Sequence, residues 1–126
     1  MIKSYRDLIV WQDSLKLAIA VYRATNSFPK HELYGLVSQL RRCSVSVPSN
    51  IAEGHAKTST KDYLRHISIA LGSMAELETQ LILATELKYV GESTLQELMA
   101  ASDVLGRRLR SLQNSLNKRL QVDKTL

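Results

Sequence analysis

The stretch that decides the fold is LQELMAASDVLGRRLRSLQNSL, residues 95–116. Apolar side chains recur in it at alternating steps of three and four residues, the spacing that places them on one face of an α-helix. The opposite face is polar, so the stretch predicts an amphipathic helix with a narrow, heptad-like seam that packs against other helices. The seam consists of Leu95, Leu98, Ser102, Leu105, Leu109, Leu112, Leu116 and Arg119.

Two further helical patterns lie in the first half of the chain. Apolar residues repeat at the same steps over residues 9–26, and Pro29 ends this pattern because proline disfavours helical geometry in the residue before it. A second stripe covers residues 32–54. Pro48 predicts a kink within that helix, and Gly54 suits a left-handed cap at its end.

A fourth pattern covers residues 59–88 and begins with the capping-box spacing of Ser59 and Asp62. Its apolar side chains occupy more of the circumference than a surface helix needs, so we expect this helix to be central and shared with another subunit. Four helices joined by short loops predict an all-α, antiparallel, up-down-up-down four-helix bundle. We expect a single domain over residues 1–120 and a frayed tail over residues 121–126.

Composition narrows the class of protein. The 126 residues suffice for one core, and five glycines and two prolines are too few for the many turns of a β-sandwich or barrel. The single cysteine excludes an internal disulfide framework and fits a reducing compartment. The first residues lack the apolar core of a signal peptide, and we expect no segment to reach the roughly 20 apolar residues of a membrane span. We therefore expect a soluble, cytoplasmic protein with no membrane partner.

Catalysis has no support in the sequence. The three histidines, His31, His55 and His66, are not spaced as metal ligands, and no nucleophile elbow or phosphate-binding glycine loop is present. Cys43 lies on an apolar stripe and behaves as a small core residue. We therefore expect no enzymatic activity, no catalytic residue, no cofactor and no metal site.

Positive charge is the clearest functional signal. The chain carries 17 Lys and Arg against 12 Asp and Glu, a net charge of +5, which makes nucleic acid the first partner to test. One basic cluster comprises Lys57, Lys61 and Arg65. A second comprises Arg107, Arg108, Arg110, Lys118 and Arg119. Asp103 is the only acid between residues 100 and 120, so we expect phosphate to bind the second cluster first. Solvated helix faces are the alternative interpretation of both clusters.

Two polar residues border the predicted core of the second helix. Antiparallel pairing around a loop at residues 55–58 places Asn50 level with Tyr63. A partly buried Asn50 would then fix the helix register, and Glu53 would close the helix end against Lys57 or Lys61. A polar notch that binds a ligand is the alternative.

The same pairing predicts a contact further along these two helices. It brings Arg41 and Arg42 near Gly72, Ser73 and Glu76. An ion pair between helices or between subunits is the expected result.

Several short strings, taken together, point to a known family. They are Phe28-Pro29, Glu32-Leu33-Tyr34-Gly35-Leu36, Gln39-Leu40-Arg41-Arg42, Asn50-Ile51-Ala52-Glu53-Gly54 and Ala70-Leu71-Gly72-Ser73. Over residues 5–120 the chain resembles the four-helix-bundle proteins encoded in intervening sequences of bacterial 23S ribosomal RNA genes. That resemblance implies a ring-like homopentamer. A related group, the accessory variability determinants of diversity-generating retroelements, is similar in being basic, pentameric and bound to reverse transcriptase and nucleic acid.

Two functions follow as hypotheses. The first is a non-enzymatic homopentamer that binds RNA or DNA without sequence preference, or acts as an adaptor, through rings of basic side chains. The second is a protein-interaction scaffold that engages a partner such as a reverse transcriptase.

Overall fold

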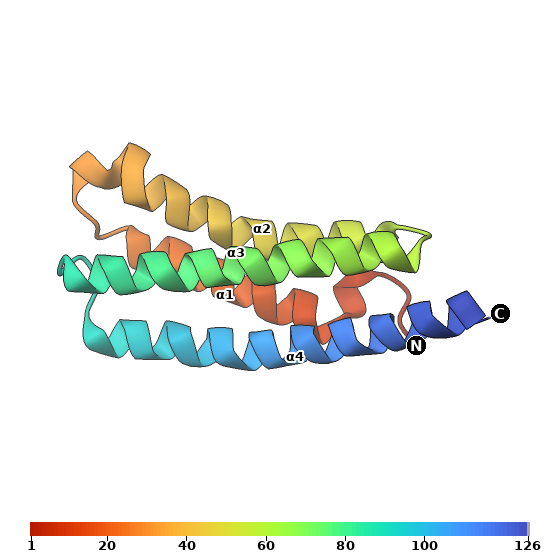
Figure 1. Cartoon of the computed structure of the whole chain (residues 1–126). Coiled ribbons are helices and arrows are strands. Elements are labelled where there is room, and N and C mark those ends of the chain that lie inside the picture. Colours follow the sequence, from red (N-terminus) through yellow and green to blue (C-terminus); the bar gives the residue numbers. More distant parts are fainter. Residues whose placement is uncertain (126) are drawn as a thin grey trace.

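The computed structural model describes residues 1–125, and within them it contains helices and no strand. The four long helices are α1 (Ile9–Thr25), α2 (Ser38–Ala56), α3 (Thr60–Glu86) and α4 (Glu92–Thr125). Three short helical turns, η1 (Tyr5–Asp7), η2 (Lys30–Glu32) and η3 (Leu33–Val37), precede α1 and α2. The long helices lie side by side as a bundle (Figure 1), which confirms the all-helical prediction.

The core lies along the inner faces of all four helices. The predicted seam of α4 is buried at Leu98, Leu105, Leu109 and Leu116, while Leu112 packs at the edge of the core. α1 and α3 are diagonally opposite, because α1 packs on α2 and α4, and these two helices in turn pack on α3. The outer faces of α1 and α3 therefore point to different sides of the bundle.

Neighbouring helices run in opposite directions where α2 meets α3. Ser46 contacts Ser73, and Asn50, one turn later in α2, contacts His66, which is nearly two turns earlier in α3. The connection between these helices is only residues 57–59, and the hydroxyl of Ser59 accepts a hydrogen bond from the Asp62 amide. The predicted helix start at Ser59 is thereby confirmed.

The entry into α2 differs from the prediction of one helix from residue 32 onward. The chain forms η2 and η3 first, and the backbone leaves helical geometry at Gly35, where φ is −106° and ψ is −110°. Pro48 lies inside α2. The observed departure from helical geometry lies thirteen residues before this proline, at a glycine, which has no side chain to restrict its backbone.

Gly54 does not end α2, as its sequence position suggested. It is buried within the helix, which continues to Ala56. A Cβ atom at this position would lie 2.8 Å from Cβ of His66 and 2.9 Å from Cδ1 of Tyr63. The glycine therefore serves close packing between α2 and α3 rather than a turn.

α4 also extends further than expected. It reaches Thr125, so residues 121–125, where we expected a frayed tail, are part of the helix, and Leu126 lies outside the described residues. At about 1.5 Å per residue, the 34 residues of α4 span about 51 Å and the 27 residues of α3 about 41 Å. The carboxyl end of α4 projects past the α2–α3 connection (Figure 1).

The expectation that no segment is long and apolar enough to span a membrane was wrong for α3. By length and composition alone, it is long and apolar enough to cross a membrane. The core helix of a soluble bundle meets the same criterion, and nine α3 residues are buried within this bundle. Length and composition therefore do not separate the two roles for this helix.

Candidate functional site

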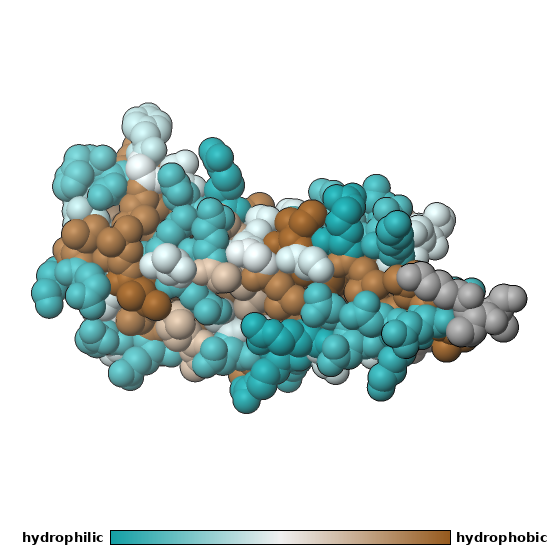
Figure 2. Space-filling view, viewed as in Figure 1, coloured by the Kyte–Doolittle hydropathy of each residue, from teal (hydrophilic) through white to brown (hydrophobic). Residues whose placement is uncertain are grey.

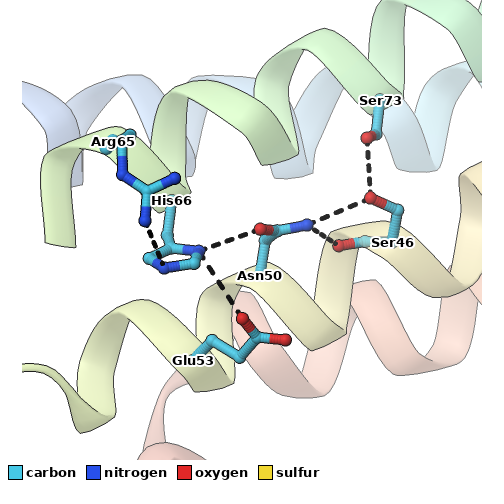
Figure 3. A network of polar contacts seen from close by, with 6 residues as sticks. All are labelled: Ser46, Asn50, Glu53, Arg65, His66 and Ser73. Atoms are coloured by element: carbon cyan, nitrogen blue, oxygen red, sulfur yellow. Dashed lines mark hydrogen bonds and ion pairs between the residues drawn. The ribbon is translucent and has the colours of Figure 1, made fainter. Parts of the chain in front are cut away.

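A line of polar side chains joins α2 to α3 along one side of their contact (Figure 3). Asn50 donates from Nδ2 to the carbonyl oxygen of Ser46 at 2.8 Å and to its hydroxyl at 3.1 Å. That hydroxyl lies 2.8 Å from the hydroxyl of Ser73 in α3. We give the name polar seam to this line of side chains, which consists of Cys43, Ser46, Asn50, His66, Ser73 and Glu76.

His66 is the buried member of the polar seam, with 5% of its surface exposed. Its Nδ1 lies 3.0 Å from Oδ1 of Asn50, and its Nε2 lies 3.3 Å from a guanidinium nitrogen of Arg65. Asn50 Oδ1 can only accept, and Arg65 can only donate. The two contacts therefore assign His66 the neutral tautomer that carries its proton on Nδ1.

Cys43 continues the polar seam toward the other end of the bundle. Its Sγ donates to Oε2 of Glu76 at 3.0 Å and lies 3.8 Å from Oε1 of Gln80. Burial, reinforced by the bond to Glu76, raises the pKa of the Cys43 thiol to about 12. A thiol that stays protonated at neutral pH is a poor nucleophile, in line with the expected core role.

A hollow of about 220 Å³ opens beside this stretch of the polar seam. Arg42 and Glu76 lie at it, together with Cys43, and no ion pair joins Arg42 to Glu76 among the described side chains. Every buried side-chain nitrogen and oxygen of the described residues has a hydrogen-bond partner. The polar groups satisfy one another, which favours a role in helix register over a ligand site.

The predicted register of α2 against α3 was wrong by about one turn. Asn50 contacts His66 rather than lying level with Tyr63. Glu53 approaches His66, with 3.9 Å between Oε2 and Nδ1, and not Lys57 or Lys61. The cause is the continuation of α2 past Gly54, which moves the connection toward higher residue numbers.

Arg41 was also misplaced by the sequence argument. It points to α1, where Nε donates to the Thr25 hydroxyl at 2.9 Å and Nη2 donates to Oδ1 of Asn26 at 3.0 Å. Its guanidinium lies over the ring of Tyr22, 4.7 Å from the centroid. Arg41 thus ties α2 to α1 and forms no ion pair with Glu76.

Both predicted basic clusters lie on the surface. Their side chains are all exposed, namely Lys57, Lys61, Arg65, Arg107, Arg108, Arg110, Lys118 and Arg119. The sequence of α4 places few acids near its basic cluster, but another helix supplies one, because Arg108 forms an ion pair with Asp13 of α1. Arg110 shares a hollow of about 90 Å³ with Glu78 and Asp103.

Two apolar surfaces remain on the outside of the bundle. On α1 and α2, a groove of about 490 Å³ is lined by Leu15, Ile19, Tyr22 and Val45, which are 39–43% exposed. We call it the α1–α2 groove. On the opposite helix, Figure 2 shows hydrophobic side chains along α3 between hydrophilic borders. We call this the α3 surface; its exposed members are Ile69, Ile82 and Leu83 of α3 and Leu87, which follows the end of the helix.

Metal-ligand geometry is missing from the described residues, in which no group of three or more His, Cys, Asp or Glu side chains could hold an ion. His66 and Glu53 approach each other, but Cys43 lies about two turns before Asn50, the α2 residue that contacts His66. His66, which we did not expect to be a metal ligand, is a buried residue that joins α3 to Asn50 of α2.

The chain is similar to a known protein family and to a solved structure. Residues 6–111 match the family described as 23S rRNA-intervening sequence protein. A crystal structure from Bacteroides thetaiotaomicron, of a protein of unknown function from the S23 ribosomal protein family, superposes with a TM-score of 0.75. The identity is 22%, over 83% of this chain and 98% of that one. No curated protein matches the chain. The match over residues 6–111 shows that the chain belongs to the 23S rRNA-intervening sequence protein family.

Proposed function

We propose that the chain is a non-enzymatic, cytoplasmic nucleic-acid-binding or adaptor protein, built as an antiparallel up-down-up-down bundle that assembles into a ring of five. It binds the backbone of RNA or DNA without reading the base sequence. The observation that carries this proposal is the exposure of eight Lys and Arg side chains in two clusters on α3, α4 and the connection before α3. Charges presented in five copies act together, so contacts that are weak singly give measurable affinity.

The apolar surfaces support assembly. A closed ring uses heterologous contacts, in which one patch of each subunit meets a different patch of the next. The α1–α2 groove and the α3 surface are two such patches, and they belong to diagonally opposite helices. A monomer in water would leave both exposed.

The absence of enzymatic activity is supported by chemistry. The one thiol is buried and its pKa is raised to about 12, and the buried histidine already uses both ring nitrogens in contacts with Asn50 and Arg65. Neither group is available as a nucleophile or general base.

An electrophoretic shift across a salt series tests the proposal. The protein should retard duplex and structured RNA and DNA of unrelated sequences alike, and the logarithm of the binding constant should fall linearly with the logarithm of the salt concentration. Light scattering on the same sample should give about 71 kDa, five times the 14.2 kDa chain. Failure to retard any nucleic acid at low salt would reject the binding function.

A protein scaffold is the second candidate. A groove of about 360 Å³ between α1 and α4 favours it, because apolar Leu17, Leu98 and Val104 line it beside the Asp13–Arg108 pair. A reverse transcriptase is the partner to test by co-purification. Retention of such a partner by a protein that binds no nucleic acid would support this candidate.

A further inference from the structure

Charge along α4 is divided between its two halves. The acids Glu92, Glu97 and Asp103 precede every base of the helix, and beyond them Asp123 is the single acid. The bases begin at Arg107. Acids near the amino end and bases near the carboxyl end favour any helix through its dipole, so α4 alone has a structural explanation.

α3 has the reverse order, which the dipole does not explain. Its bases Lys61 and Arg65 lie in the first two turns with one acid, Asp62, and the other acids, Glu76, Glu78 and Glu86, lie in the second half. Acids near the carboxyl end of a helix oppose its dipole. The order of charges in α3 and α4 therefore needs a common explanation, which the relative placement of the two helices provides.

The contacts between helices bring the two base-rich segments to the same end. Ser102 of α4 contacts Glu78 of α3, and Gln113 contacts Ser68, so the carboxyl half of α4 lies along the amino half of α3. The pKa of Tyr63 is raised by burial, and the nearby charge of Arg119 opposes that rise. Tyr63 and Arg119 are thus near one another at this end.

A cross-section through the bundle separates the charges. Contacts at Ser46–Ser73 and Asp13–Arg108 place residues 1–12, 47–72 and 107–125 on one side of it. We call this part the basic half; it contains 11 Lys and Arg against 4 Asp and Glu, a net charge of +7. Residues 13–46 and 73–106 contain 6 bases against 8 acids, a net charge of −2. The entire positive excess of the protein is in one half.

Aromatic side chains have the opposite distribution. The strongly exposed rings, Tyr34 at 93% and Tyr22 at 42%, lie outside the basic half. Within it, Tyr63 is buried, while Tyr5 and Trp11 pack against each other with 5.2 Å between centroids. Single strands are bound by stacking their bases on exposed aromatic rings, and strong exposure of this kind is absent from Tyr5, Trp11 and Tyr63, the Tyr and Trp side chains among the described residues of the basic half.

We propose that the basic half is the docking surface for the phosphate backbone of a nucleic-acid duplex. This inference rests on the proposed function. In this proposal the bundles run along the axis of the ring, so that rotation about this axis keeps the same end of every subunit on the same side. The five basic halves therefore share one face of the ring, and the duplex binds that face alone.

The test compares two variants with equal charge. The basic-half variant carries Lys57→Glu, Lys61→Glu and Arg119→Glu, all at exposed positions; Arg65 is left unchanged because it contacts the buried His66. The matched control carries Lys16→Glu, Lys30→Glu and Lys88→Glu, exposed bases of the other half. Each variant changes the chain from a net charge of +5 to −1.

Binding is measured for a duplex of about 25 base pairs, as RNA and as DNA, and for the matching single strands, in a salt series. We expect the basic-half variant to lose about tenfold or more in duplex affinity and to have a shallower salt dependence, whereas the control stays within about threefold of the original protein. Equal losses in both variants, or tighter binding of the single strands, would overturn the inference while leaving the proposed function intact.

Two checks keep these outcomes distinct. Circular dichroism and light scattering verify that each variant is folded and assembled, and alanine at Lys57, Lys61 and Arg119 replaces glutamate if the reversal disturbs either. If the original protein binds no nucleic acid at low salt, both the proposed function and this inference fail. The RNA and DNA arms decide which duplex is preferred, because a 2′-hydroxyl contact adds affinity only for RNA.

Discussion

His66 donates from Nδ1 to Oδ1 of Asn50 across the contact of α2 and α3, over 3.0 Å. The bond is possible because α2 continues past Gly54 and so brings Asn50 level with the second turn of α3. It fixes which residues of the two helices face each other, since a slip of one turn would leave a buried imidazole nitrogen without an acceptor.

Replacing Asn50 with Leu should lower the free energy of unfolding by about 1–3 kcal/mol, because His66 loses its acceptor in a buried position. Helix content by circular dichroism should change little, while the urea midpoint falls and the assembly loosens. The double variant Asn50→Leu, His66→Leu should recover part of the loss, since both polar partners are then absent. Unchanged stability and assembly, with loss of ligand binding alone, would favour the polar-notch interpretation.

Gly54→Ala should destabilise the protein by about 1–3 kcal/mol, because the added Cβ would lie 2.8 Å from Cβ of His66. Gly72→Ala is the matched control: it is also in a helix, and a Cβ there meets no atom within 4 Å. That change should stabilise the protein by up to about 1 kcal/mol through helix propensity. Thermal unfolding of the two variants should therefore shift in opposite directions, and equal shifts would contradict the close contact.

Cys43 should make stability depend on alkaline pH. Its pKa is about 12 in the folded protein and near 9 when the chain is unfolded, so the unfolded state releases its proton first as pH rises. The stabilising contribution is complete below pH 9 and is lost between pH 9 and 12, by at most about 1.4 kcal/mol per pH unit. Cys43→Ala should flatten this part of the stability profile, although tyrosine ionisation remains. At pH 8, iodoacetamide should modify the thiol slowly unless guanidinium unfolds the chain.

Reversal of Arg107, Arg108 and Arg110 to Glu should weaken binding of RNA and DNA of any sequence through the salt-dependent part of the affinity. Arg108 is separable from the other two, because it alone forms the ion pair with Asp13. Arg108→Glu by itself should also lower the melting temperature slightly, since a half-exposed ion pair contributes at most about 1 kcal/mol. If the triple reversal leaves affinity unchanged while reversal of Lys57, Lys61 and Arg65 abolishes it, the α4 arginines are not part of the interface.

Ile19→Glu should split the proposed pentamer without unfolding the bundle. Ile19 is 43% exposed in the α1–α2 groove, so a carboxylate there stays in water in the monomer but would be buried in an assembly. Light scattering should fall toward 14.2 kDa at retained helicity. Ile9→Glu, on the same helix but outside the groove, is the matched control and should preserve the assembly. Dissociation by both variants would place the interface elsewhere on α1.

The helices were predictable because apolar periodicity is a local property. The seam from Leu95 to Leu116 identifies α4 directly, and Ser59 marks the start of α3. The register between α2 and α3 was not predictable, because Gly54 has the residue type of a helix cap and only the packing of Tyr63 and His66 shows that it has another role. The signal for His66 was present, since it follows Tyr63 by three residues on a buried face.

The candidate site was less predictable than the fold, since charges from different helices combine only in three dimensions. Asp13 is 95 residues away from Arg108, so no reading of α4 alone reveals their ion pair. Likewise, the acids of α3 and α4 were visible in the sequence, but their common placement follows from contacts such as Gln113 with Ser68.

The three-residue connection between α2 and α3 also bears on the order of folding. Closing a short loop costs little chain entropy, and the polar seam specifies the pairing once the two helices meet. We expect the α2–α3 hairpin to form the folding nucleus, with substitutions such as Val47→Ala or Ile67→Ala slowing refolding. The contacts of α1 with α4 span most of the chain and should form after the transition state, so substitutions there would speed unfolding instead.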